Sequence, residues 1–262
     1  LFVVAHAVLG FADDWSKASG RGGLRARAKL IGQIALAFGF VASWIYLMST
    51  QTLTNVRYVL VESGWIFSTM PMMLFFIAFF ALVIVATSNA VNLTDGIDGL
   101  AAGLCVQVGF GFLLASNFVA PLEIGLFSDL FWMALAGACL GFLFFNRYPA
   151  RVFMGDTGSL ALGAAVGIGA ILTGTVLLLP FIGFVFWLEM GSVILQVLYF
   201  KYTKRKTGEG QRLFRRAPLH HHFEMGGWTE WRVVLTLWFV NFVAMAIGLA
   251  LLHTGIIPRF PY

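Results

Sequence analysis

Charged side chains are missing from long stretches of this chain, and this feature limits the folds that are open to it. Hydrophobic residues make up 60% of the 262 residues and charged residues only 11%, whereas about a quarter of a soluble domain is charged. A transmembrane helix needs about 20 consecutive apolar residues. The uncharged runs that meet or approach this length are 31–56, 63–94, 99–122, 130–146, 157–188 and 233–258. The sequence therefore predicts an all-α, polytopic integral membrane protein.

About eight transmembrane helices are predicted, the first of them partial. The run 157–188 is too long for one helix, and the Thr-Gly-Thr sequence at 173–175 with Pro180 predicts a turn within it. The predicted spans are 1–12, 30–49, 71–90, 99–117, 130–146, 159–178, 181–200 and 233–253. The segment 1–12 is too short to cross a bilayer, so we expect it to be the end of a helix whose beginning is missing. We expect a single transmembrane domain over 1–262, truncated at its N-terminus.

Basic residues predict the orientation of these spans. Because successive spans cross in opposite directions, four connecting segments share one side of the membrane. These segments are 13–29, 91–98, 147–158 and 201–232. They hold all of the 17 Lys and Arg residues except Arg57 and Arg259. Lysine and arginine concentrate in cytoplasmic loops, so this side is predicted to be the cytoplasm.

Five aspartates lie on the same side, although acidic residues contribute little to membrane orientation. They are Asp13, Asp14, Asp95, Asp98 and Asp156. Gathered carboxylates repel one another unless a cation lies between them, and Mg²⁺ takes one or two carboxylates and completes its shell with water and substrate phosphates. For Asp95 or Asp156 alone, helix capping is the simpler explanation. It does not suit Asp13 and Asp14, because acids at the C-terminal end of a helix oppose the helix dipole. Asp95 and Asp98 are three apart and would share one face if a helix has already begun there.

Two glycine-containing motifs stand at predicted helix starts. They are "DGIDG" at 95–99 and "GDTGS" at 155–159. Exposed backbone N–H groups at a helix N-terminus bind phosphate; the alternative is that the glycines permit a tight turn or close helix packing in the membrane. Lys17 and Lys29 could hold a diphosphate or a lipid phosphate, while most other basic residues are explained by orientation and by contact with anionic headgroups.

The stretch "RRAPLHHHFEMGGW" at 215–228 has three consecutive histidines beside two arginines. These side chains could contact phosphates or sugar hydroxyls, or donate protons. The alternative is a polar interfacial loop that Phe223 and Trp228 anchor at the headgroups. Spacing alone favours neither alternative.

Polar residues inside the predicted spans are few. Glu189 is a functional candidate because it is an acid within a span, but a buried, hydrogen-bonded strut between helices is favoured, well away from the aspartates. Cys105 and Cys139 are expected to be small buried apolar groups. Together these features predict a membrane enzyme that acts on phosphate-bearing substrates with Mg²⁺ at the cytoplasmic face.

Four motifs together resemble the bacterial phospho-N-acetylmuramoyl-pentapeptide-transferases, of the polyprenyl-phosphate N-acetylhexosamine-1-phosphate transferase superfamily. The motifs are "GFADDWSK", "SNAVNLTDGIDGLA", "FNRYPARVFMGDTGSLALG" and "APLHHHFEMGGW". The resemblance covers nearly the whole chain and implies ten spans in the complete family member. It implies transfer of phospho-MurNAc-pentapeptide from UDP-MurNAc-pentapeptide to undecaprenyl phosphate, giving lipid I and UMP, with Mg²⁺, in the bacterial cytoplasmic membrane. Membrane lipids and a second copy of the chain are the other expected partners, and nucleic acid is not one.

The resemblance also implies roles for individual residues. Asp156 matches the metal-binding aspartate, and Asp13 and Asp14 match a catalytic pair, with Asp13 as base or nucleophile. Lys17 and Lys29 match essential lysines. The remaining positions match substrate-binding residues, with Phe153 stacking on uracil and the two histidines near the sugar-peptide: Asn92, Asp95, Gly96, Asp98, Asn146, Phe153, Gly155, His220 and His221.

Two other functions stay open. A transferase of GlcNAc-1-phosphate to a polyprenyl phosphate would share the aspartate motifs, and only the "PLHHHFE" sequence favours the muramoyl donor. A transporter belongs to a different class and would place its charges at the bilayer midplane, where this sequence has only Glu189.

Overall fold

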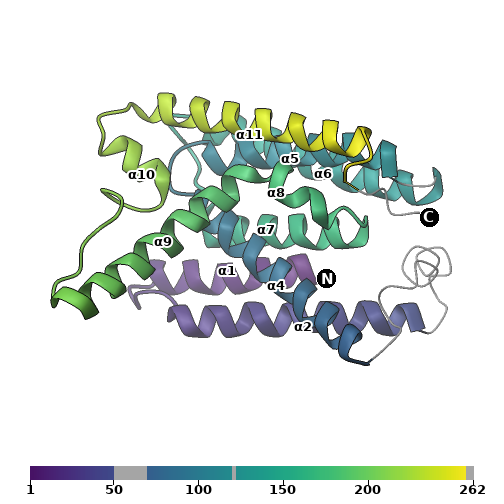
Figure 1. Ribbon diagram of the computed structural model, residues 1–262, viewed down its shortest axis with the longest axis horizontal. Coiled ribbons are helices and arrows are strands. Elements are labelled where there is room, and N and C mark those ends of the chain that lie inside the picture. The colour runs from purple at the N-terminus through teal and green to yellow at the C-terminus, as the bar shows by residue number, and fades with distance from the viewer. Residues whose placement is uncertain (50–69, 120–121, 258–262) are drawn as a thin grey trace.

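The computed structural model describes residues 1–49, 70–119 and 122–257, and the described chain is helical without a strand (Figure 1). The helices are α1 (Phe2–Ala18), α2 (Ala26–Ser49), α4 (Met70–Thr94), α5 (Leu100–Val119), α6 (Leu122–Asn146), α7 (Gly155–Leu172), η1 (Val176–Leu178), α8 (Leu179–Ile182), α9 (Phe184–Thr207), α10 (Leu219–Glu224) and α11 (Glu230–His253). Within the described ranges, six helices are long and apolar enough to cross a membrane, and 100–116 forms a shorter apolar helix. The predicted class, an all-α polytopic membrane protein, is confirmed.

Helix ends differ from the predicted spans mainly at the polar ends. Helix α1 continues to Ala18, and α2 begins at Ala26 rather than at residue 30, so the predicted connection 13–29 is helical except at 19–25. An uncharged run in the sequence marks only the apolar part of a helix. The helix itself continues until the backbone leaves the helical conformation. Gly20, Gly22 and Gly23 have φ of 74°, 79° and 83°, a left-handed conformation that stops α1. The predicted turn at 173–175 is confirmed, because α7 ends at Leu172.

Helix α7 lies at the centre of the bundle and is the most buried of the candidate spans. Its neighbours approach it backbone to backbone. A Cβ atom on Gly10 of α1 would lie 2.2 Å from the Asp156 carbonyl oxygen, and one on Gly163 of α7 would lie 2.4 Å from the Thr87 carbonyl oxygen of α4. Small residues allow such close contacts between membrane helices, and here they fix the start of α7 against α1.

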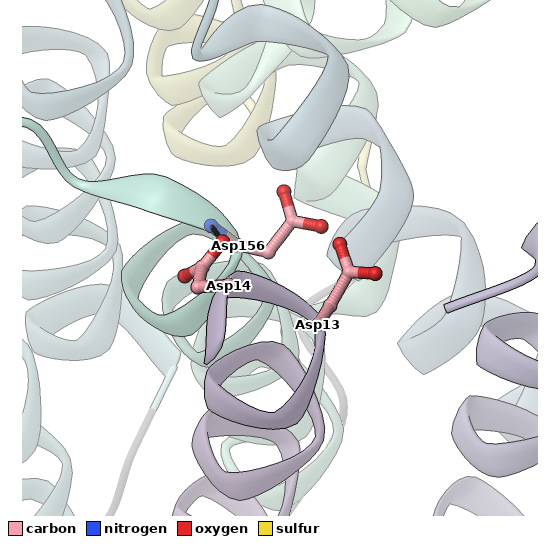
Figure 2. Close-up of side chains that lie close together, drawn as sticks. All are labelled: Asp13, Asp14 and Asp156. Carbon is pink, nitrogen blue, oxygen red and sulfur yellow. Dashed lines mark hydrogen bonds between the residues drawn. The ribbon is translucent and has the colours of Figure 1, made fainter. Parts of the chain in front are cut away.

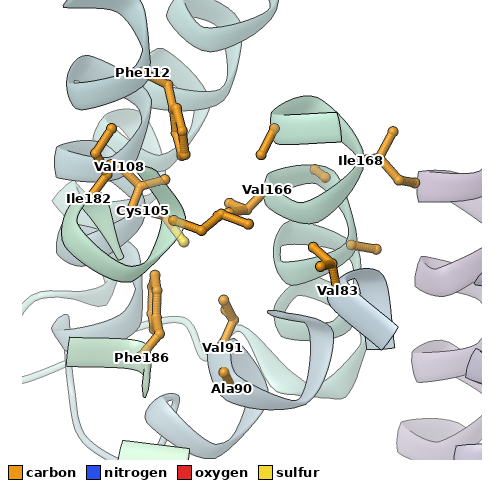
Figure 3. Close-up of a cluster of buried hydrophobic side chains, with 14 of the residues drawn as sticks. Val83, Ala90, Val91, Cys105, Val108, Phe112, Val166, Ile168, Ile182 and Phe186 are labelled. Atoms are coloured by element: carbon orange, nitrogen blue, oxygen red, sulfur yellow. The ribbon is translucent and has the colours of Figure 1, made fainter. Parts of the chain in front are cut away.

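Apolar side chains fill the space between α7 and its other neighbours. Figure 3 shows Val166 of α7 facing Cys105 and Val108 of α5, with Phe186 of α9 beneath them. Both cysteines are buried and free, as the sequence predicts. This packing holds α4, α5, α7 and α9 together so that their polar ends meet.

The polar connections gather at one end of the bundle, on the left in Figure 1, where α10 and the connection between α1 and α2 lie. Hydrogen bonds join segments that are distant in sequence. The Ala150 N–H donates to the Asp98 carboxylate over 2.8 Å, and the Gly99 N–H donates to the Asn146 side chain over 3.1 Å. The structure therefore confirms that the four connecting segments lie at the same end of the bundle. Their cytoplasmic location stays a prediction.

Candidate active site

Three aspartates from two helices form the centre of the polar end. Asp13 and Asp14 are in the last two turns of α1, and Asp156 is the second residue of α7. One oxygen from each carboxyl group lies within 4.8 Å of the other two. Figure 2 shows the side chains of Asp13 and Asp156 next to each other, with Asp14 directed toward the start of α7. The close contact at Gly10 explains why residues so far apart in sequence meet here.

Asp14 caps helix α7 from outside that helix. Its carboxylate accepts hydrogen bonds from the Asp156 N–H over 3.2 Å and the Thr157 N–H over 2.9 Å, and a third from the Thr157 hydroxyl over 2.6 Å. A carboxylate at a helix N-terminus satisfies free N–H groups and favours the helix dipole. Burial acts to raise the pKa of Asp14, but the bonds from Thr157 and Asp156 lower it more strongly. The unfavourable position of Asp14 at the end of α1 is thus offset by the start of α7.

Asp13 is almost completely buried, with 1% of its side chain exposed. Its Oδ1 accepts the Leu24 N–H over 2.6 Å, and its Oδ2 pairs with Lys17 at 2.7 Å and with Lys29 at 3.2 Å. The adjacent Asp156 side chain, followed by the donors Lys17, Leu24 and Lys29, holds the pKa of Asp13 well below its usual range although burial opposes this shift. Asp13 is therefore an anion at neutral pH.

Two lysines bridge the aspartates. The Oδ2 atom of Asp156 lies 3.2 Å from the Lys17 Nζ and 2.5 Å from the Lys29 Nζ, so both lysines touch both Asp13 and Asp156. On the other side of Asp156, its Oδ1 accepts the side-chain amide of Asn92 over 2.8 Å. The predicted catalytic residues thus form one connected cluster, and Asn92 orients Asp156 within it.

This cluster has the composition of a divalent cation site. Three carboxylates outweigh two lysines in charge, which leaves the pocket net negative. Two oxygens on opposite sides of one Mg²⁺ are about 4.2 Å apart, slightly less than the 4.8 Å limit of the carboxylate cluster. The residues therefore fit a cation that one or two carboxylates bind directly, with the third at a distance that water bridges.

The turn 95–99 lies between α4 and α5. Asp95 and Asp98 do not share a helix face, because α5 begins only at Leu100; the reason is the left-handed Gly99, whose φ is 77°. Burial, with the carboxylates of Asp156 and Asp14 nearby, raises the pKa of Asp95 to about 7. Because the folded chain binds this proton more tightly than the unfolded chain, the stability contributed by Asp95 falls as the pH rises from about 4 to about 7.

The other predicted substrate-binding residues divide into two groups. Phe153 is 75% exposed, and Gly155 has a φ of 64° and leaves room for Asp14, because a Cβ atom at position 155 would lie 2.7 Å from the Asp14 carboxylate. By contrast, Asn146 is buried and donates to the Val152 carbonyl over 2.9 Å, and Asp98 accepts from Ala150. In this structure Phe153 is free to contact a ligand, while Asn146 and Asp98 tie the turn 95–99 to the segment 147–154.

The predicted histidines have different surroundings. His221 is partly exposed, and its Nδ1 lies 2.7 Å from Glu224. His220 is fully buried, and its Nδ1 and N–H both contact the carboxylate of Glu189, at 3.1 and 3.2 Å. Glu189 is therefore a buried strut as predicted, but the prediction that it lies well away from the aspartate face is wrong. The reason is that the histidine segment folds back onto α9 and reaches the turn 95–99 beside Gly96.

Some residues of the site had no clear signal in the sequence. Thr157 and Ser159 stand inside the "GDTGS" motif, and their contacts to Asp14 and Asn92 identify them as supports of the cluster. Glu230 accepts the Asp98 N–H over 2.7 Å; nothing in its position in the sequence indicates this. Phe223 and Trp228, the headgroup anchors of the alternative interpretation, stack on each other at 4.9 Å and pack against the core.

The contact between His220 and Gly96 gives a first prediction. A methyl group on Gly96 would lie 2.3 Å from the His220 Nε2, so Gly96→Ala forces the buried ring or the turn to move. We expect the free energy of unfolding to fall by about 1–3 kcal/mol. In the variant that also carries His220→Ala, the added cost of alanine at 96 should nearly vanish, and chemical denaturation in detergent measures this coupling.

Gly141→Ala in α6 is the matched control, because a Cβ there meets nothing within 4 Å. It should be neutral or slightly stabilising. Equal costs of Gly96→Ala with and without His220 would show that the ring does not hold this turn.

Comparison with known proteins defines the class. Residues 1–174 match the family model described as glycosyl transferase family 4. With the helices and the acidic site described above, this match defines a polytopic membrane transferase.

Individual relatives narrow the family further. A phospho-N-acetylmuramoyl-pentapeptide-transferase of Moorella thermoacetica is 46% identical over 254 residues, which cover 94% of this chain and 73% of the relative. Those of Desulforudis audaxviator and Pelodictyon phaeoclathratiforme are 43% and 42% identical, with 94% and 92% of this chain and 72% and 68% of the relatives covered. The chain therefore belongs to the phospho-N-acetylmuramoyl-pentapeptide-transferases, within glycosyl transferase family 4.

Proposed function

We propose that the protein transfers phospho-MurNAc-pentapeptide from UDP-MurNAc-pentapeptide to undecaprenyl phosphate and releases UMP. The observation that carries this proposal is the cluster of Asp13, Asp14 and Asp156 with two bridging lysines, in a chain that belongs to this family. The reaction joins two phosphate-bearing substrates, and their charges require cations and orienting groups of this kind.

Each member of the cluster has a proposed role. Asp156, with Asn92 fixing its orientation, holds Mg²⁺, and the metal when bound would neutralise charge on the donor diphosphate. Asp13 takes or holds a proton at the acceptor phosphate, or attacks as a nucleophile. Lys17 and Lys29 bind phosphate oxygens of the substrates, and the Lys17 side chain is 50% exposed for this role. Asp14 keeps the start of α7 in place.

The surroundings of the cluster support a nucleoside site. Phe153 is exposed two residues before α7, where its ring can stack on a uracil base. Asp95 and Gly96 lie in the turn that His220 contacts, and Asp95 has a pKa near neutrality, so it can donate or accept a hydrogen bond. We propose that this turn and Phe153 bind the uridine, and that His221 faces the sugar-peptide.

The alternatives make different predictions. A GlcNAc-1-phosphate transferase would use the same aspartates, so UDP-GlcNAc should compete with the donor. A transporter needs charges at the bilayer midplane, whereas the acidic cluster lies at the end of the bundle, and the buried Glu189 is paired with His220.

The deciding experiment measures UMP release by the purified protein in detergent, with UDP-MurNAc-pentapeptide, undecaprenyl phosphate and Mg²⁺. Release should require all three. An excess of UDP-GlcNAc should neither replace the donor nor inhibit strongly. Release with UDP-GlcNAc as the sole donor would favour the alternative transferase, and no release under any condition would count against both.

We also propose that the protein lies in the bacterial cytoplasmic membrane with its site on the cytoplasmic side, and that it forms a homodimer. The support for sidedness is the concentration of Lys and Arg in the segments at the site end. Labelling of single cysteines tests it, after Cys105 and Cys139 have been replaced by alanine.

A cysteine at Thr207, at the end of α9, should react only with a reagent that reaches the cytoplasm. One at Thr254, at the opposite end of α11, should react from outside intact cells. Both positions are exposed. The reverse pattern would place the site outside.

A further inference from the structure

A second charged region lies apart from the aspartate cluster, between α9 and the segment 211–217. It is a pocket of about 410 Å³, within the size range of small-molecule sites. Val193, Val197 and Phe200 of α9 form an apolar floor, and Lys201, Arg212 and Arg216 supply three positive charges. The shape combines a hydrophobic surface with a cationic rim.

The pocket is a built feature, because side chains of α9 hold the covering segment. The Gln196 Oε1 accepts the N–H groups of Leu213 and Phe214 over 3.0 and 2.8 Å, and the Thr203 hydroxyl accepts the Gln211 N–H over 2.8 Å. These bonds fix the backbone on both sides of Arg212. The arginines are therefore positioned over the apolar floor by the fold.

The three cations have no counter-charge in the described part of the chain. None of the described residues lining the pocket is acidic, and Lys201, Arg212 and Arg216 form no ion pair with a described residue. Three positive charges around one pocket repel one another, so an anion that binds between them is attracted by all three. The occupant should therefore carry a negative headgroup.

The apolar floor shows what else the occupant should carry. Neighbouring residues on the other faces of α9, Ile194, Leu195 and Leu198, are about half exposed, as expected of a helix that contacts lipid tails. Lys201 begins the basic end of this helix, and basic residues at the end of an apolar span attract anionic headgroups. We propose that this pocket binds an anionic phospholipid, with its phosphate between Lys201, Arg212 and Arg216 and an acyl chain along Val197 and Phe200.

Binding of a short-chain phosphatidylglycerol to the purified protein in detergent, measured by native mass spectrometry, tests this proposal. Arg212→Gln with Arg216→Gln should weaken binding roughly 30-fold, since each cation near a lipid headgroup contributes about 1 kcal/mol. The matched control, Arg205→Gln with Lys206→Gln, removes the same charge from the last turn of α9, at residues that do not line the pocket. It should change binding by less than about threefold, because both side chains are exposed to solvent and do not line the pocket, so solvent and salt screen their charges.

A second variant separates the floor from the charges. Val197→Trp fills the floor without altering any charge and should also abolish phosphatidylglycerol binding; unchanged binding would overturn the proposed acyl contact. Unchanged melting temperatures without lipid show that the variants are folded.

An equal loss of phosphatidylglycerol binding in the pocket double variant and in the control double variant would overturn the proposal. Binding of short-chain phosphatidylcholine as tight as that of phosphatidylglycerol would also overturn it. Equal stabilisation by inorganic phosphate would make this a free anion site, and displacement only by polyprenyl phosphate would assign it to the acceptor substrate.

Discussion

Replacing Asp156 by alanine should abolish Mg²⁺-dependent UMP release, with kcat lowered at least about a thousandfold. A metal that stabilises transition-state charge contributes several kcal/mol, and a Mg²⁺ site with one or two carboxylate ligands cannot spare one. Asp156 is also the residue that Lys17, Lys29 and Asn92 all contact. The measurement is UMP release as a function of Mg²⁺ concentration.

Two comparisons make this result specific. Glu209→Ala removes an exposed carboxylate just beyond α9 and should leave turnover and its Mg²⁺ dependence unchanged. Asp156→Asn keeps an oxygen for the Asn92 amide, so its fold should be preserved while turnover is still lost. Near-normal turnover of Asp156→Ala at ordinary Mg²⁺ would remove Asp156 from the metal site.

The sequence predicts that the aspartate motifs lie at one end of the bundle, because this follows from where each helix begins and ends. Uncharged runs mark helices, glycines mark their ends, and alternation across the membrane brings the aspartate motifs to one end of the bundle. Asp13, Asp14 and Asp156 could therefore be grouped without knowing any contact between helices. Their closeness within 4.8 Å needs the packing of α1 on α7 at Gly10. A glycine in a sequence allows such an approach but does not indicate the partner.

Contacts between helices also explain what sequence reasoning missed. Asp14 caps α7 across a helix boundary, whereas capping is recognisable in a sequence only within a few residues of the same helix. The bonds by which Asn146 and Asp98 brace two connecting segments were not predicted either, and the substrate-binding role of these two residues stays a prediction. The pairing of Glu189 with His220 depends on the return of the segment 208–218 to α9, and no periodicity in the sequence predicts that return.

The neighbouring aspartates of α1 should respond differently to the same conservative change. Asp14→Asn weakens the cap of α7, so it should lower the free energy of unfolding by about 0.5–2 kcal/mol. Among the described residues, only the Leu24 N–H donates a backbone hydrogen bond to Asp13, and an asparagine oxygen can keep that bond. Asp13→Asn should therefore leave the fold nearly intact and remove mainly the charge between Lys17 and Lys29.

Asp13→Asn should lower kcat about 10²- to 10⁴-fold with little change in the donor KM. A group that transfers a proton or attacks acts in the transition state and contributes little to ground-state binding. The amide is nearly the same size as the carboxylate, so a loss of this magnitude reflects the missing negative charge. Initial rates of UMP release at varied donor and acceptor concentrations separate kcat from both KM values. An increase in the KM for undecaprenyl phosphate with unchanged kcat would make Asp13 a binding residue and would leave the proton transfer to another member of the cluster.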